Sequence, residues 1–124
     1  MQRNLPATPR VFHVNWFRRD KTTNELLWPG FGENLRAILW ALEHSEGKAQ
    51  AAHTPMGYVP TPDALNVSGL DLSREAIQAI LEIDPGDWAE DLADQRAFFD
   101  KIGPRLPKEL RQEQEAFAKR LGQP

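Results

Sequence analysis

The stretch that most constrains this chain is WPGFGEN, at residues 28–34. Pro29 fixes its own φ angle and limits the freedom of the turn. Gly30 and Gly32, on either side of a phenylalanine, lack the Cβ atoms that would keep another group away from the backbone. We therefore expect a stiff turn with an aromatic ring at its centre and a backbone that other atoms can approach.

A helical pattern follows this turn directly. Apolar residues recur at a spacing of three or four, at Leu35, Ile38, Leu39 and Leu42. The pattern predicts a helix over residues 33–46, with Asn34 as its N-cap because a short amide side chain can accept a bond from an exposed helix-start N–H.

Residues 1–32 are expected to form a hairpin together with the turn. Val11–Phe17, VFHVNWF, is rich in β-branched and aromatic residues, and its apolar residues alternate as they do in a strand. The polar residues 18–25 predict a turn, and Leu26–Trp28 a short returning strand. Since a lone hairpin is marginally stable in water, we expect it to complete a larger sheet.

The rest of the chain divides into a loop and a helical tail. Residues 47–70 contain repeated Gly and Pro turns and predict an ordered loop with a short extended piece at 56–59. Residues 71–124 predict further helices, one of them opened by Asp84-Pro85 and closed by Gly103-Pro104. The expected fold is α+β and mostly helical, with a short hairpin followed by about four helices.

Composition excludes several classes of function. The 124 residues suit one domain or part of one, and the net charge of -3 argues against nucleic acid or an anionic membrane as a partner. The chain has no cysteine, so it offers no disulfide and no thiolate nucleophile. No signal peptide or long apolar run is evident, and we expect a soluble, cytoplasmic protein.

The residues around the turn favour binding of a flat ring. Phe17 and Phe31 offer aromatic faces close together if the hairpin closes, and the helix start offers N–H groups without intrahelical acceptors. A heteroaromatic ring stacked on phenylalanine, with its edge on those N–H groups, fits both features. The alternative is that Gly and Pro only shape a turn and that Phe31 fills the core.

Five segments carry a resemblance to a known family: VFHVNWFRRD, LLWPGFGENLR, TPMGYVPTPDAL, GLDLS and FFDKIGPRLPKEL. In this order they resemble the C-terminal part of GTP-dependent phosphoenolpyruvate carboxykinase, over nearly the whole chain. The resemblance implies that Phe17 and Phe31 sandwich guanine and that Asn34 contacts the base edge. It also places Gly32 and Glu33 in the GTP-binding run, and Leu26 where the family usually has a third aromatic residue.

The resemblance further implies an enzyme that converts oxaloacetate and GTP into phosphoenolpyruvate, carbon dioxide and GDP in gluconeogenesis, with Mn²⁺ at the active site and Mg²⁺ on the nucleotide. No residues here match the family's phosphate loop or its metal ligands, and there is no G-x-x-x-x-G-K-[ST] segment. We therefore expect a C-terminal fragment of the catalytic domain that binds GTP or GDP, partners the remainder of that domain, and is inactive alone.

Other candidate sites are weak. His13, His44 and His53 lack metal-ligand spacing, and no nucleophile–base pair is evident, so no catalytic residue and no metal ligand is assigned. Acidic residues cluster on one predicted helix face, which is typical of a solvated surface. The second hypothesis for the whole chain is a stand-alone helical module that binds a partner protein without catalysis.

Overall fold

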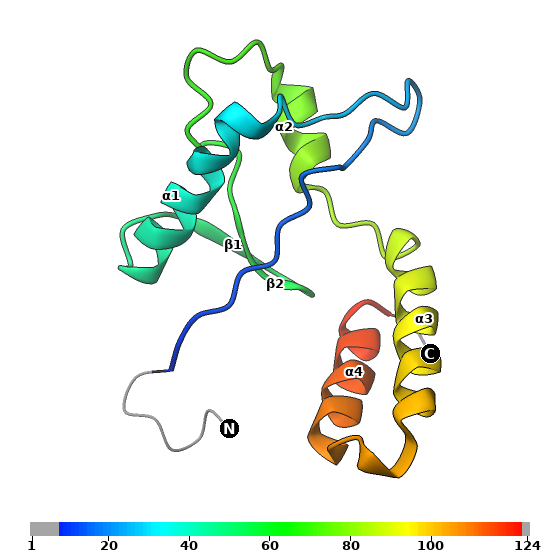
Figure 1. Ribbon diagram of the computed structural model, residues 1–124. Coiled ribbons are helices and arrows are strands. Elements are labelled where there is room, and N and C mark those ends of the chain that lie inside the picture. The colour runs from blue at the N-terminus through cyan, green and yellow to red at the C-terminus, as the bar shows by residue number, and fades with distance from the viewer. Residues whose placement is uncertain (1–7, 123–124) are drawn as a thin grey trace. The chain divides into compact units, whose positions relative to one another are not determined.

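The computed structural model describes residues 8–122 and has an α+β, mostly helical fold, which confirms the predicted class (Figure 1). Within these residues the hairpin strands are β1 and β2, and two short 3₁₀ turns cover Phe31–Glu33 and Gly103–Arg105. The bounds of the regular elements are α1 Asn34–Ser45, β1 Ala51–Thr54, β2 Gly57–Pro60, α2 Arg74–Leu81, α3 Asp87–Ile102 and α4 Lys108–Arg120.

The predicted position of the hairpin is wrong. Val11–Phe17 forms no strand, and the hairpin lies at residues 51–60, inside the segment expected to be a loop. The pairing of Val11–Phe17 with Leu26–Trp28 that the sequence predicts is absent, and Leu26 instead forms one antiparallel bridge with Arg19, inside the segment expected to be the turn. Strands need a continuous backbone partner, and a tight turn supplies one at 51–60, whereas nothing in residues 8–122 forms a ladder with Val11–Phe17.

Val11–Phe17 instead contributes side chains to an aromatic core. Phe12 meets Trp40 of α1 edge-on, with ring centroids 6.1 Å apart, and Trp16 lies against Trp28 at the same centroid distance. The two buried tryptophans form a cluster with Leu65. This compact unit comprises residues up to 52 together with 60–81, and it contains the whole WPGFGEN turn.

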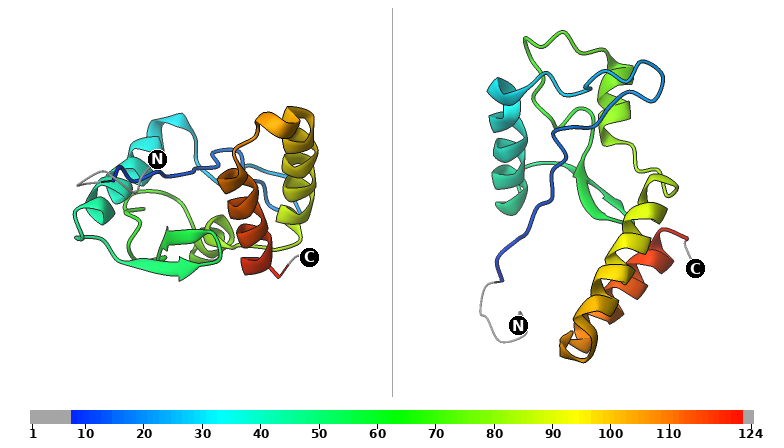
Figure 2. Two further views of the ribbon diagram at one scale, coloured as in Figure 1. Left: turned by 90° about the horizontal axis from the view of Figure 1, so that it is seen from below. Right: turned by 45° about the vertical axis from the view of Figure 1, so that its right-hand side comes forward.

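The second compact unit comprises residues 53–59 and the segment from Glu82 onward. In it α3 and α4 lie side by side, as both views in Figure 2 show. Leu92 packs with Ala118 and Leu121, and the buried Gln114 side chain donates a hydrogen bond to the carbonyl of Leu92 at 3.1 Å. That bond satisfies a polar group in an apolar interface.

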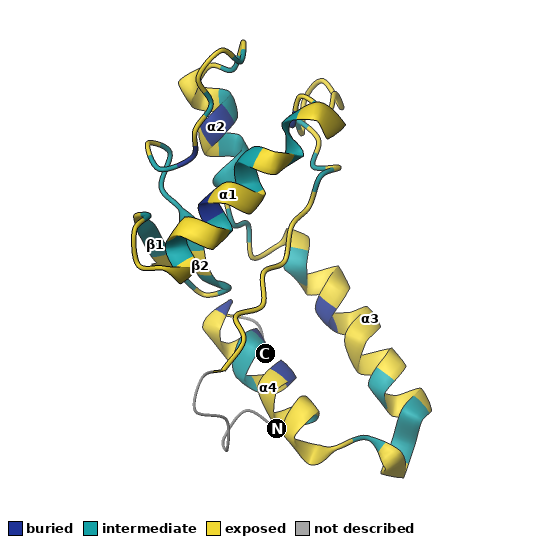
Figure 3. Ribbon diagram, turned by 60° about the vertical axis from the view of Figure 1, so that its left-hand side comes forward, coloured by how far each residue is buried: buried dark blue, intermediate teal, exposed yellow. Residues whose placement is uncertain are grey.

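The apolar face of α1 is largely uncovered among the described residues. Trp40 is the one buried residue of this helix, and most of its surface is exposed or half-buried (Figure 3). Large apolar side chains that remain about half exposed on it are Leu35, Ile38, Leu39 and Leu42. Exposed apolar surface of this kind is typical of a region that another surface covers. No helix within residues 8–122 is both long and apolar enough to cross a membrane.

We predict that this chain in isolation self-associates through these apolar side chains. Replacing Leu39 and Leu42 with Glu should shift the population toward monomer while helicity stays unchanged, because both residues already face outward. Light scattering after size-exclusion chromatography, with circular dichroism on the same samples, measures both quantities. A wild-type chain that is monomeric at high micromolar concentration would contradict the prediction.

Candidate functional site

In the turn at residues 28–34, one residue has a backbone conformation that only glycine can adopt. Gly30 has φ 124° and ψ -175°, a region that is closed to residues with a Cβ atom. The chain then enters the 3₁₀ turn, where the Glu33 N–H donates to the Gly30 carbonyl at 3.1 Å and the Asn34 N–H donates to the Phe31 carbonyl. The sharp turn and the start of α1 are therefore one hydrogen-bonded structure.

The predicted N-cap role of Asn34 is wrong. Asn34 is the first residue of α1, and its side chain makes no capping bond. Its Oδ1 atom instead accepts a hydrogen bond from the indole Nε1–H of Trp28 at 2.9 Å. The indole is buried in the aromatic core, and its N–H needs an acceptor there. Nothing in the spacing of the sequence pointed to this bond.

The backbone donors at the helix start are fewer than expected. The N–H groups of Glu33 and Asn34 are used inside the turn. The N–H groups of Phe31 and Gly32 make no hydrogen bond to any residue in the described part of the chain. Among Gly32, Glu33 and Asn34, Gly32 is thus the residue whose backbone N–H remains available to an external acceptor.

Both phenylalanines of the predicted site face solvent. Phe31 is 91% exposed and Phe17 76% exposed, so the alternative in which Phe31 fills the core is wrong. The segments that carry them are joined by the contact of Trp16 with Trp28 and by the Leu27 N–H, which donates to the Arg18 carbonyl at 2.9 Å. The two phenylalanine rings make no contact with each other within residues 8–122, which leaves their faces uncovered.

Glu33 is held by a neighbouring cation. Its carboxylate lies 2.6 Å from Nε of Arg36, one turn further along the helix. Arg36 also donates from Nη1 to the carbonyl of Asn66 at 2.9 Å, which ties the start of α1 to the loop that precedes α2. The i,i+3 spacing of Glu33 and Arg36 was a signal for this pair in the sequence, although the link to Asn66 was not.

Nothing in the described residues, 8–122, requires a glycine at position 32. A Cβ atom added there would meet nothing within 4 Å, and the backbone of Gly32 does not have a positive φ angle. Gly30 differs, because its positive φ angle alone demands glycine. The open space above Gly32, beside the exposed ring of Phe31, is where an external group could reach the backbone.

Asp20 organises the turn between Phe17 and the returning segment. Its Oδ1 atom accepts the N–H of Thr22 at 2.7 Å and that of Thr23 at 2.8 Å. These bonds, that from Thr23 foremost, hold the pKa of Asp20 below its ordinary value, because they stabilise the ionised carboxylate. The Asp20 carbonyl also accepts the Asn24 N–H at 2.9 Å, which closes the turn.

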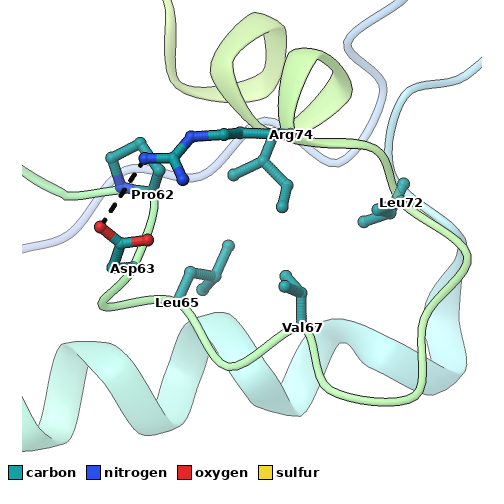
Figure 4. Close-up of a pocket in the computed structure, with 7 residues that line it drawn as sticks. Pro62, Asp63, Leu65, Val67, Leu72 and Arg74 are labelled. Carbon is teal, nitrogen blue, oxygen red and sulfur yellow. Dashed lines mark ion pairs between the residues drawn. The ribbon is translucent and has the colours of Figure 1, made fainter.

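A separate hollow of about 390 Å³ lies between the loop after β2 and the start of α2 (Figure 4). Its walls are mostly apolar, and an ion pair of 4.0 Å joins Arg74 to Asp63 at its rim. The residues that line it are Pro62, Asp63, Leu65, Val67, Leu72, Arg74 and Ile77. None belongs to the predicted site. Within residues 8–122 no three His, Asp or Glu side chains are grouped so that they could hold a metal ion.

The amino-acid sequence matches a family of known proteins. The family model for the phosphoenolpyruvate carboxykinase C-terminal P-loop domain matches residues 1–120. The GTP-type phosphoenolpyruvate carboxykinase of Anaeromyxobacter dehalogenans strain 2CP-1 is 40% identical over 98% of this chain. That of Renibacterium salmoninarum is 44% identical over 92% of the chain, and that of Chlamydia trachomatis serovar D is 42% identical over 85%.

The chain therefore belongs to the GTP-dependent phosphoenolpyruvate carboxykinase family and represents a C-terminal portion of it. It spans about a fifth of the length of the curated relatives it matches: 20% of the Anaeromyxobacter protein, 19% of the Renibacterium protein and 18% of the Chlamydia protein. The family match favours the carboxykinase hypothesis over that of a stand-alone interaction module.

The two glycines of the turn should respond differently to alanine. Gly30→Ala should lower the free energy of unfolding by about 1–3 kcal/mol, because it forces a Cβ atom into a glycine-only conformation. Gly32→Ala should leave stability unchanged or raise it by up to about 1 kcal/mol, since its backbone suits alanine and the space is open. Urea unfolding of both variants measures this, and equal losses would contradict it.

Acid should loosen the turn at residues 20–25. The pKa of Asp20 is lower in the folded state, so its stabilising effect is fully present above the ordinary aspartate pKa and is lost as pH falls through the folded value. Amide exchange at Thr22 and Thr23 should therefore accelerate, relative to the intrinsic rate, at acid pH. An Asp20→Asn variant should show a weaker pH dependence, and identical profiles would contradict the assignment.

Proposed function

We propose that this chain forms the guanine-binding surface of a GTP-dependent phosphoenolpyruvate carboxykinase. The observation that carries the proposal is the exposure of Phe31 at 91%, on a turn where the adjacent Gly32 serves no internal purpose. An exposed aromatic ring beside open backbone gains free energy when a flat apolar ligand covers it and removes it from water. Phe17, 76% exposed on the neighbouring segment, supplies the second face.

The two phenylalanines would hold the base by stacking. Stacking of a base on an aromatic side chain contributes about 1–3 kcal/mol and tolerates any base, because every base has a π face. The protein must therefore distinguish guanine from adenine by contacts to the edge of the base. Guanine carries an acceptor oxygen at position 6, where adenine carries an amino donor. The Gly32 N–H and the Asn34 side chain are the groups that would read this position, and Leu26, 48% exposed, would close the pocket apolarly.

The wider reaction belongs to the same proposal. Oxaloacetate and GTP would yield phosphoenolpyruvate, carbon dioxide and GDP, a decarboxylating lyase reaction of gluconeogenesis in the cytoplasm. Mn²⁺ would act at the active site, and Mg²⁺ would accompany the nucleotide. The residues described here do not fit a metal site, since no three potential ligands are grouped among them. In this proposal the metals and the phosphates are bound by other parts of the carboxykinase.

Two variants separate stacking from edge reading. In the intact protein, Phe31→Ala should weaken GTP and ATP alike, by about 5- to 150-fold if the whole stacking energy is lost. Asn34→Ala should weaken GTP while mostly sparing ATP, because the contact to the base that it removes lies at the edge and not at the ring faces; it also removes the bond from Trp28, which is present whichever nucleotide binds. Titration calorimetry should measure the dissociation constants of GTP and of ATP for each variant and compare them with those of the wild type.

The matched control is Phe98→Ala on α3. Phe98 is also an exposed phenylalanine, at 59%, and the proposal gives it no role in nucleotide binding. Its removal should change neither dissociation constant. The proposal fails if Phe31→Ala leaves GTP binding unchanged, or if the Phe98 variant weakens it equally.

A further inference from the structure

The hydrogen bond between Trp28 and Asn34 determines which end of the Asn34 amide faces away from the core. An indole N–H is a donor and never an acceptor, whereas an asparagine amide has an acceptor oxygen at one end and a donor nitrogen at the other. With Nε1 of Trp28 at 2.9 Å from Oδ1 of Asn34, the oxygen is turned toward the indole. The Nδ2 group is then the end left to the exterior.

The buried indole of Trp28 keeps the Asn34 amide from flipping. Trp28 is 7% exposed and belongs to the buried cluster with Trp40 and Leu65, and Trp16 packs against it. If the amide flipped, its NH₂ group would face the indole N–H and leave a buried donor without an acceptor. Buried polar groups are rarely left in that state. The buried core therefore determines which end of the Asn34 amide is exposed at the turn.

We propose that Trp28 is the positioning residue for base specificity: its indole N–H holds the Asn34 amide so that a donor, and never an acceptor, faces position 6 of the purine. This inference rests on the proposed guanine-binding function and deepens it. A free amide could serve either base, since its oxygen would accept the adenine amino group and its nitrogen would donate to the guanine oxygen. Held by Trp28, the amide presents its donor nitrogen and so favours guanine.

The direct test is Trp28→Phe in the intact protein, which removes the N–H and keeps an aromatic ring. The GTP-over-ATP preference, measured as the ratio of dissociation constants, should fall about five- to tenfold, the lower end of base-edge discrimination. ITP has the same oxygen at position 6 but lacks the 2-amino group, so its affinity should fall together with that of GTP.

The matched control is Trp40→Phe. Trp40 is equally buried, at 6%, lies in the same cluster, and donates its indole N–H to the Gln50 carbonyl at 3.1 Å, not to Asn34. It should lose similar stability in thermal unfolding and keep the wild-type nucleotide ratio. If both tryptophan variants shift the ratio equally, core damage explains the effect and the inference is overturned.

Asn34→Asp tests, with Trp28 intact, the reading of the base edge by residue 34 on which the role of Trp28 depends. One carboxylate oxygen can still accept the indole N–H, and the other then presents an acceptor to position 6, which favours adenine. The added charge repels the phosphates of both nucleotides and so cancels in the ratio. The GTP-over-ATP ratio should fall below that of Asn34→Ala. A ratio no lower than that of the alanine variant would overturn the inference even if Trp28→Phe failed to fold.

The outcomes distinguish failure of the positioning role of Trp28 from failure of the proposed guanine-binding function. If the wild-type protein shows no preference for GTP, the guanine-binding function fails and the role of Trp28 fails with it. If the wild type prefers GTP, Asn34→Ala reduces that preference and Trp28→Phe does not, the guanine site stands and the positioning role alone is overturned.

Discussion

Burial of the Trp28 indole is the interaction on which the rest of this region depends. The indole joins Trp40 of α1, Leu65 of the following loop and Trp16 of the first segment in one core. A buried indole must find an acceptor for its N–H, and here the acceptor is the first residue of α1. The same side chain thereby packs the unit together and anchors the start of the helix that carries the turn.

Stability and recognition are divided between neighbouring residues of this turn. Trp28 and Gly30 maintain the fold, one by burial and the other by a conformation that glycine alone adopts. Phe31 and Gly32 do neither, since the ring lies in solvent and a Cβ atom on Gly32 would meet nothing. The exposed ring and the open backbone beside it are therefore both accessible to a ligand, as the proposed binding role requires.

The predicted strand at Val11–Phe17 is wrong, whereas the predicted guanine site stays a prediction. Phe17 and Phe31 were identified as a pair of available faces, and both are exposed. Val11–Phe17 was interpreted as a strand because its residues alternate, but alternation also suits an extended segment that packs Phe12 and Trp16 against a core. Side-chain pattern reports which residues seek burial, and it does not report whether a backbone partner is present.

The sequence by itself determined the family, the α+β class, the stiff turn before α1 and the aromatic residues on either side of it. These follow from local chemistry, because proline, glycine and apolar spacing act on near neighbours along the chain. Only the tertiary structure decided that Asn34 bonds to Trp28 and does not cap its helix, and that Arg36 links Glu33 to Asn66. An amide or a guanidinium group has several partners within reach along the chain. For Asn34 the partner is decided by the buried Trp28 indole, whose N–H must find an acceptor. For Arg36 it is decided by the loop that the fold brings beside the start of α1.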